Sequence, residues 1–140
     1  MLSVNAYPAD YVTASRARFA SLLNAYRHLA DGPSSTDPRA GIADFEPHFI
    51  RSVIVSLDAS FVHRVRAQEG KDGNPLNEIR MLAGSILTND GVLAPNTTIK
   101  YVAEHSVAGT EIGQPINPTI DTVEALIVAV HDEIQTRYSK

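Results

Sequence analysis

Residues 44–69, DFEPHFIRSVIVSLDASFVHRVRAQE, decide the fold of this chain. The stretch contains no glycine, and its large apolar residues recur at spacings of one, three or four. At 3.6 residues per turn, that spacing places them on one broad face of an α-helix. The face comprises Phe49, Ile50, Val53, Ile54, Leu57, Phe61 and Val65. We therefore predict a helix over residues 44–69 whose apolar face builds the core.

A second stripe runs along the other side of this helix. It carries Arg51, Val55, Asp58 and Val62, next to small residues at positions 52, 56, 59 and 60. One interpretation is a helix–helix or subunit interface, in which a polar contact fixes the register. The other is an exposed arginine and aspartate beside two incidental valines. We favour the interface, because the small side chains permit close packing, and we predict a homodimer through this stripe.

Three further helices are expected, over residues 9–30, 75–88 and 119–138. Asn74 followed by Pro75 is typical of a helix start, because asparagine caps free N–H groups and proline is tolerated in the first turn. Residues 97–116 favour extended structure but are interrupted by glycine and proline, which indicates a small β-hairpin or an ordered irregular excursion. The predicted fold is mainly α: one four-helix bundle-like domain over residues 1–140, with this excursion between the third and fourth helices.

Composition restricts the class of protein. A chain of 140 residues that is 44% hydrophobic and 20% charged has the balance of a soluble globular domain. It has no cysteine, no apolar run long enough to span a membrane and no export signal over residues 1–6, so we expect a cytoplasmic protein. The net charge of −4 argues against a nucleic-acid partner. The one locally basic run, HRVR at residues 63–66, is interpreted as a solvated helix end.

The histidines raise the question of a metal site; they are His28, His48, His63, His105 and His131. Metal ligands in helical bundles usually lie three or four positions apart on one helix face. None of these histidines has such a partner on a core-facing stripe. His131-Asp132 looks like the dipeptide of HD-type metal phosphohydrolases, but the further ligands that those enzymes need are missing. We therefore predict no metal site and no cofactor, and we place His131 on the solvated edge of the last helix.

A polar cluster stands opposite the apolar face of the third predicted helix. Asn77, Glu78 and Arg80 offer amide, carboxylate and guanidinium groups for a ligand or a partner's carboxylate. The alternative is ordinary solvated helix surface. If the excursion folds over this face, its polar residues would complete a pocket: Lys100, Glu104 or His105. We name the three helix residues as candidate binding residues.

Catalytic motifs are missing from the sequence, which contains no nucleophile elbow and no phosphate-binding loop. Residues 49–61 are similar to the second helix of HEPN-type helical domains, some of which are ribonucleases. The nuclease signature of that family is an arginine followed four to six residues later by a histidine. No arginine–histidine pair of this chain has that spacing, so no catalytic residue is identified.

The sequence thus favours a non-enzymatic interaction or assembly module that acts as a homodimer. Two alternatives remain open. One is a helical enzyme with a dispersed site, a metal-dependent hydrolase or a ribonuclease, that uses His48, His63 or His131. The other is a small-ligand binder with its site between the third helix and the excursion.

Overall fold

The computed structural model describes residues 4–31 and 39–139. Within these ranges the chain forms four α-helices: α1 (Ala9–Asp31), α2 (Arg39–Ser60), α3 (Pro75–Thr88) and α4 (Ile120–Tyr138). The connections between α2, α3 and α4 are irregular apart from two short 3-10 turns, η1 (Arg66–Gln68) and η2 (Ala103–His105). The described part contains no strand, so the chain is mainly helical, as predicted.

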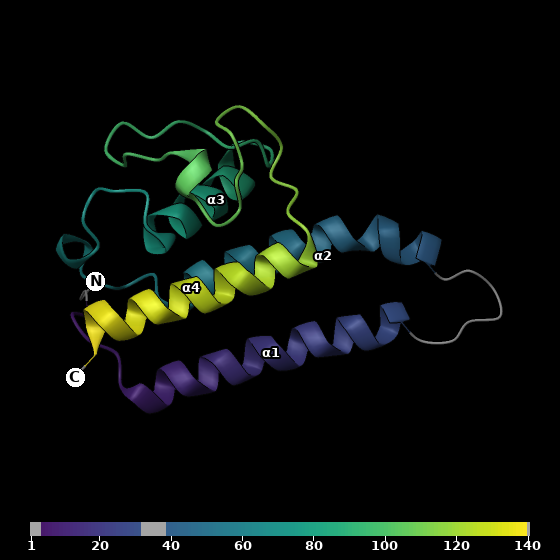
Figure 1. The fold of residues 1–140 in the computed structure, drawn as a ribbon, viewed down its shortest axis with the longest axis horizontal. Helices are drawn as coiled ribbons and strands as arrows, with labels where there is room; N and C mark the ends of the chain where they lie inside the picture. The colour runs from purple at the N-terminus through teal and green to yellow at the C-terminus, as the bar shows by residue number, and fades with distance from the viewer. Residues whose placement is uncertain (1–3, 32–38, 140) are drawn as a thin grey trace.

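Three long helices, α1, α2 and α4, are packed together along the length of the molecule, and α3 lies against α2 and α4 (Figure 1). α1 and α4 are antiparallel: Arg16 pairs with Asp132 (2.6 Å), whereas Arg27, eleven positions later, pairs with Asp121 (2.6 Å). The segment before α1 is tied to the end of α4, because Tyr7 N donates to the carbonyl of the last α4 residue (2.7 Å). The two ends of the described chain therefore meet at one end of the helical layer.

The predicted core stripe of the central helix is buried. Ile50, Val53, Ile54, Leu57 and Phe61 are each at most 2% exposed. They pack with the apolar faces of the other three helices, whose buried members include Phe19, Leu23, Ile79, Leu82, Leu126 and Val130. No helix of the described chain is long and apolar enough to cross a membrane.

α2 ends at Ser60, not at residue 69 as predicted. At its end, side chains donate hydrogen bonds to the free carbonyl groups. Tyr11 Oη donates to Ser60 O (2.6 Å), and Arg64 Nη1 donates to Phe61 O (2.9 Å). Tyr7 Oη also donates to Phe61 O (3.0 Å). The helix start also differs from the predicted residue 44. The partners at the C-terminal end include Tyr7 and Tyr11, which lie far away in the sequence and which helical periodicity alone does not show.

Residues 97–116 form an irregular excursion over α3, and the hairpin alternative is not confirmed. In the described chain this region makes isolated β-bridges instead of a strand ladder. The Glu78 carboxylate of α3 accepts hydrogen bonds from Val107 N (3.0 Å) and Ala108 N (2.8 Å). Consecutive N–H groups that both point at one carboxylate cannot pair across a hairpin, where successive residues face alternate sides. The excursion is therefore fastened to α3 by a side chain.

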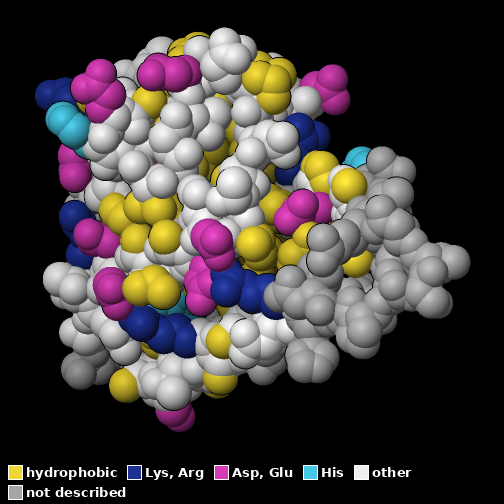
Figure 2. Space-filling view, turned by 45° about the vertical axis from the view of Figure 1, so that its right-hand side comes forward, with side chains coloured by type: hydrophobic (Ala, Val, Ile, Leu, Met, Phe, Trp, Pro, Cys, Tyr) yellow, Lys and Arg dark blue, Asp and Glu magenta, His cyan; other side chains and the backbone are white. Residues whose placement is uncertain are grey.

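Charges of both signs are mixed on the molecular surface. On the face shown in Figure 2, Lys and Arg side chains are interspersed with Asp and Glu and do not gather into one basic patch. Two arginines of α1 contribute to this pattern by pairing with acids of α4. The arrangement on this face does not supply the concentrated positive charge that phosphate binding requires.

Candidate functional site

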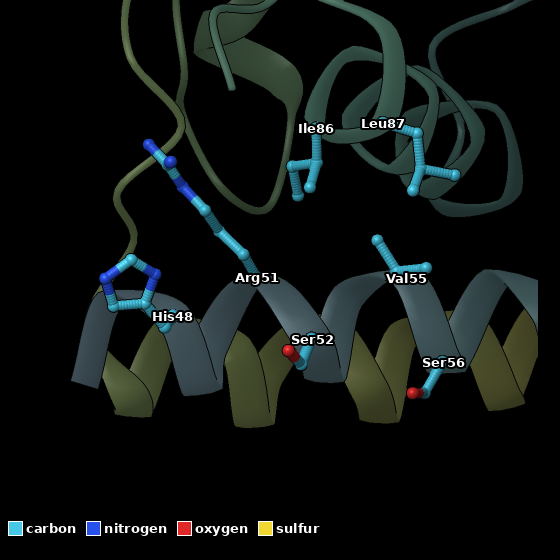
Figure 3. A pocket seen from close by; sticks show the side chains of 7 residues that line it. All are labelled: His48, Arg51, Ser52, Val55, Ser56, Ile86 and Leu87. Atoms are coloured by element: carbon cyan, nitrogen blue, oxygen red, sulfur yellow. The ribbon is translucent and has the colours of Figure 1, made fainter. Parts of the chain in front are cut away.

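A groove of about 450 Å³ lies between α2 and the end of α3, and we call it the α2–α3 groove (Figure 3). It is lined by His48, Arg51, Ser52, Val55, Ser56, Ile86 and Leu87. Ile86 and Leu87 of α3 point toward α2, with Leu87 opposite Val55, whereas Arg51 extends from α2 at the His48 end of the groove (Figure 3). The groove therefore has an apolar part and a cationic end.

Arg51 is held in place by the backbone around it. Its Nε donates to Ile116 O (3.3 Å), in the segment that leads into α4. Its guanidinium lies against Gly91, where an added Cβ would be 2.7 Å from Arg51 Cζ. Gly91 has φ +73°, a backbone conformation that residues other than glycine rarely adopt. Glycine at 91 thus provides both the turn after α3 and the space for the guanidinium.

The four predicted interface residues lie in different surroundings. Val55 is half-buried and packs on the core, while Val62 is 43% exposed. Asp58 turns away from Arg51 toward Arg64, with an Oδ1–Nη1 distance of 3.9 Å. Burial raises the pKa of the Asp58 carboxyl above its ordinary value, against the opposing charges of Arg64 and Arg80. Arg51 therefore lies at one end of the groove, whereas Asp58 has a structural role beside Arg64.

Asn77, Glu78 and Arg80 lie in three different surroundings, and the alternative of an ordinary solvated helix surface is wrong for Asn77 and Glu78. Asn77 is 2% exposed, and its side-chain amide donates to two backbone carbonyls of the turn before α3 (2.8 and 3.2 Å). Glu78 is fully buried under the excursion. Arg80 is half-buried and its guanidinium binds Glu69 (2.8 Å). The sequence pattern failed here because loops, not helices, cover this face of α3.

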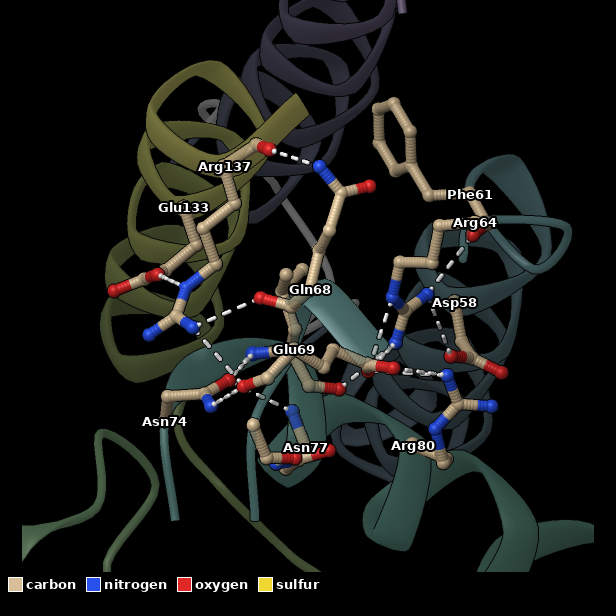
Figure 4. A network of polar contacts seen from close by, with 12 residues as sticks. Asp58, Phe61, Arg64, Gln68, Glu69, Asn74, Asn77, Arg80, Glu133 and Arg137 are labelled. Carbon is tan, nitrogen blue, oxygen red and sulfur yellow. Dashed lines mark hydrogen bonds and ion pairs between the residues drawn. The ribbon is translucent and has the colours of Figure 1, made fainter. Parts of the chain in front are cut away.

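Glu69 is the centre of a buried ion-pair network (Figure 4). Arg64, which is 1% exposed, donates from Nε and Nη2 to Glu69 Oε1 (3.0 and 2.6 Å), and from Nη2 to Leu76 O (3.0 Å). Arg80 approaches the same carboxylate from α3. The interpretation of residues 63–66 as a solvated helix end is therefore wrong for Arg64. Most of these groups pair with one another, although Asp58 Oδ1 and Arg80 Nε have no hydrogen-bond partner in the described part of the chain, so the network mainly joins elements.

His131 is also buried, which corrects its predicted place on a solvated edge. Its Nδ1 lies 2.7 Å from Ile127 O and its Nε2 lies 3.1 Å from Ser15 Oγ. A carbonyl oxygen only accepts, so Nδ1 carries a proton in this arrangement. His48 lies within α2 and His63 follows its end, and both are exposed. Among the described residues, no group of three or more potential ligands is placed to hold a metal ion.

The polar space predicted between α3 and the excursion is present but built differently. A cavity of about 390 Å³ brings Lys100 and His105 to the start of α3, and α4 contributes Glu133 and Arg137. Glu104 lines another, shallower hollow. Arg137 is already bound to Glu133 Oε2 and to the backbone carbonyls of residues 68 and 69. This cavity has a mostly polar lining, whereas the α2–α3 groove combines a cation with apolar side chains.

Comparisons with protein-family models, with curated proteins and with solved structures found no match for this chain. The similarity of residues 49–61 to HEPN-type domains gains no support from a family model. The geometry of the α2–α3 groove is therefore the main guide to function.

Proposed function

We propose that the chain is a non-enzymatic interaction or assembly module that forms a homodimer through the α2–α3 groove and its rim. The observation that carries this proposal is Leu87, which is 68% exposed at the groove rim. It is the most exposed of the large apolar side chains described. A large exposed apolar side chain beside an apolar hollow is typical of a contact surface.

Gly84 supports the same proposal. It lies in the interior of α3, it is exposed, and a Cβ added there would meet no atom of the described chain within 4 Å. Glycine inside a helix destabilises by about 0.5–1 kcal/mol relative to alanine. No described contact requires a glycine at this position, so its use is explained if another backbone approaches α3 closely.

A second copy of the chain is the partner that this surface fits best. Leu87 lines the groove and is mostly exposed, so the same patch carries an exposed apolar side chain and a hollow beside it. In a two-fold symmetric pair each copy offers the same patch to the other, and Leu87 of each copy would enter the groove of its partner. Ser52 and Ser56 at the edge of the groove are exposed and small, which permits close approach.

Light scattering on the full chain tests this proposal. Wild type is expected at twice the chain mass of 15.2 kDa, and Leu87→Asp is expected at the monomer mass with an unchanged helical circular dichroism spectrum. The mass of Val62→Asp shows whether the dimer surface extends beyond the groove to the end of α2. Val55→Asp is less informative, because Val55 packs on the core and its substitution would also unfold the protein.

Val128→Asp is the matched control, since Val128 is 49% exposed on α4 and lies outside the groove. This variant is expected to keep the dimer mass. A monomeric wild type over the accessible concentration range would reject the proposal, and so would a Leu87→Asp variant that stays dimeric.

The enzyme alternative has less support. His48, His63 and His131 belong to different surroundings, and the buried ring of His131 is engaged by Ile127 and Ser15. The bundle-like arrangement of the four helices and a cytoplasmic location remain parts of the proposal. Fractionation of cells that express the full chain tests the location.

A further inference from the structure

We propose that the Arg51 end of the α2–α3 groove binds the carboxylate of a small organic acid, whose apolar chain lies against Val55 and Ile86. This proposal is argued from the groove of a single copy and does not rest on the proposed homodimer (Figure 3). The acid's chain and the Leu87 of a second copy would occupy the same apolar part of the groove, so the acid is expected to compete with self-association.

Arg51 is a cation without an acidic partner in the described part of the chain. It is half-buried, yet no described carboxylate lies within 4.0 Å of its guanidinium. Every other buried or half-buried arginine whose side chain is described forms an ion pair: Arg16, Arg27, Arg64, Arg80 and Arg137. A partly desolvated cation without a counter-charge is costly, and a bound carboxylate would compensate it.

The Arg51 guanidinium is held in a fixed position before a ligand binds. The bond from Nε to Ile116 O fixes one edge of the guanidinium, and contact with Gly91 fixes its plane. Nη1 and Nη2 have no hydrogen-bond acceptor among the described residues. Two donors in a fixed fork match the two oxygens of a carboxylate, so little conformational entropy is lost when the acid binds.

The rest of the groove suits an apolar chain. Among the described residues that line it, none is acidic and would repel an anion. The lining next to Arg51 is apolar on the α3 side, through Ile86, and on the α2 side, through Val55. An acid with an aliphatic chain therefore fits better than a compact polar anion such as inorganic phosphate.

The test compares octanoate with octan-1-ol, which has the same chain without the charge. Each is titrated into the full chain while two-dimensional NMR follows the backbone amides, including those of Gly91 and Ile116. Octanoate is expected to bind at least about tenfold more tightly than octan-1-ol, the factor that corresponds to one charge-assisted hydrogen bond.

Arg51→Met should remove this preference, whereas Arg66→Met should retain it, because Arg66 is exposed and outside the groove. If Arg51→Met is poorly folded, Arg51→Lys provides the second test: it keeps a charge without the fork, and it should retain a smaller preference for octanoate. Equal binding of the two probes by wild type, or an unchanged preference in folded Arg51→Met, would overturn the proposal. Light scattering on the same samples gives their masses, so a failure of self-association is distinguished from a failure of octanoate binding.

Discussion

Glu78 shows how one buried residue holds a long segment of irregular chain. Its carboxylate is fully buried, and two consecutive N–H groups of the excursion bind it. No described cation pairs with it. Burial therefore dominates and raises the pKa of the Glu78 carboxyl above its ordinary value of 4.5, although the bonds from Ala108 and Val107 oppose this shift.

This raised pKa predicts a pH dependence of stability. The folded protein binds the Glu78 proton more tightly than the unfolded chain, so the contribution of this group to the free energy of unfolding is greatest below its unfolded pKa. That contribution falls as the pH rises through the folded pKa. Urea unfolding of wild type and Glu78→Gln between about pH 4 and pH 8 should show the wild type losing stability relative to the variant as the pH rises, because the neutral amide resembles the protonated carboxyl.

Glu104→Gln is the control for this measurement, because Glu104 is an exposed carboxylate on the same excursion. Its difference from wild type is expected to be small at each pH. A wild type that gains stability relative to Glu78→Gln as the pH rises would show that the two N–H bonds outweigh burial.

At the scale of single elements, the sequence predicted what depends on near neighbours. The buried stripe of α2 follows from its own periodicity, and the start of α3 follows from its cap: Asn74 Oδ1 accepts from Leu76 N (3.0 Å) and Asn77 N (3.1 Å). The end of α2 was not predictable in this way, because its terminal carbonyls are bound by Tyr11 and other residues far along the chain.

Gly84 allows a prediction about one element. Gly84→Ala should raise the free energy of unfolding by about 0.5–1 kcal/mol, because φ at Gly84 is not positive and the space for a Cβ is open. Urea unfolding of a monomeric background such as Leu87→Asp measures this effect without the dimer. A loss of stability would mean that the described surroundings of Gly84 do need a glycine.

At the scale of the whole molecule, both the candidate site and the rigid framework combine elements that are distant in sequence. The groove joins α2 to Ile86 and Leu87, while Gly91 and Ile116 position Arg51. The sequence identified Arg51 and Val55 as exceptional on α2, but nothing local indicated which segment would lie opposite them. The same limit applies to Arg64, whose acidic partner is buried by the packing of α3.

The buried network should contribute far more to stability than the ion pairs on the surface. Glu69→Gln keeps the shape of the side chain but leaves Arg64 buried without its counter-charge, which should lower the free energy of unfolding by about 3–5 kcal/mol. Glu124→Gln removes one acid from Arg27 on the exposed α1–α4 side and should cost less than about 1 kcal/mol. Urea unfolding at neutral pH compares the two variants. A domain has only about 5–15 kcal/mol of net stability, so the first change should leave a marginal fold and the second a nearly unchanged one. Similar losses would mean that Glu69 is not the group that holds α2, α3 and the turn between them together.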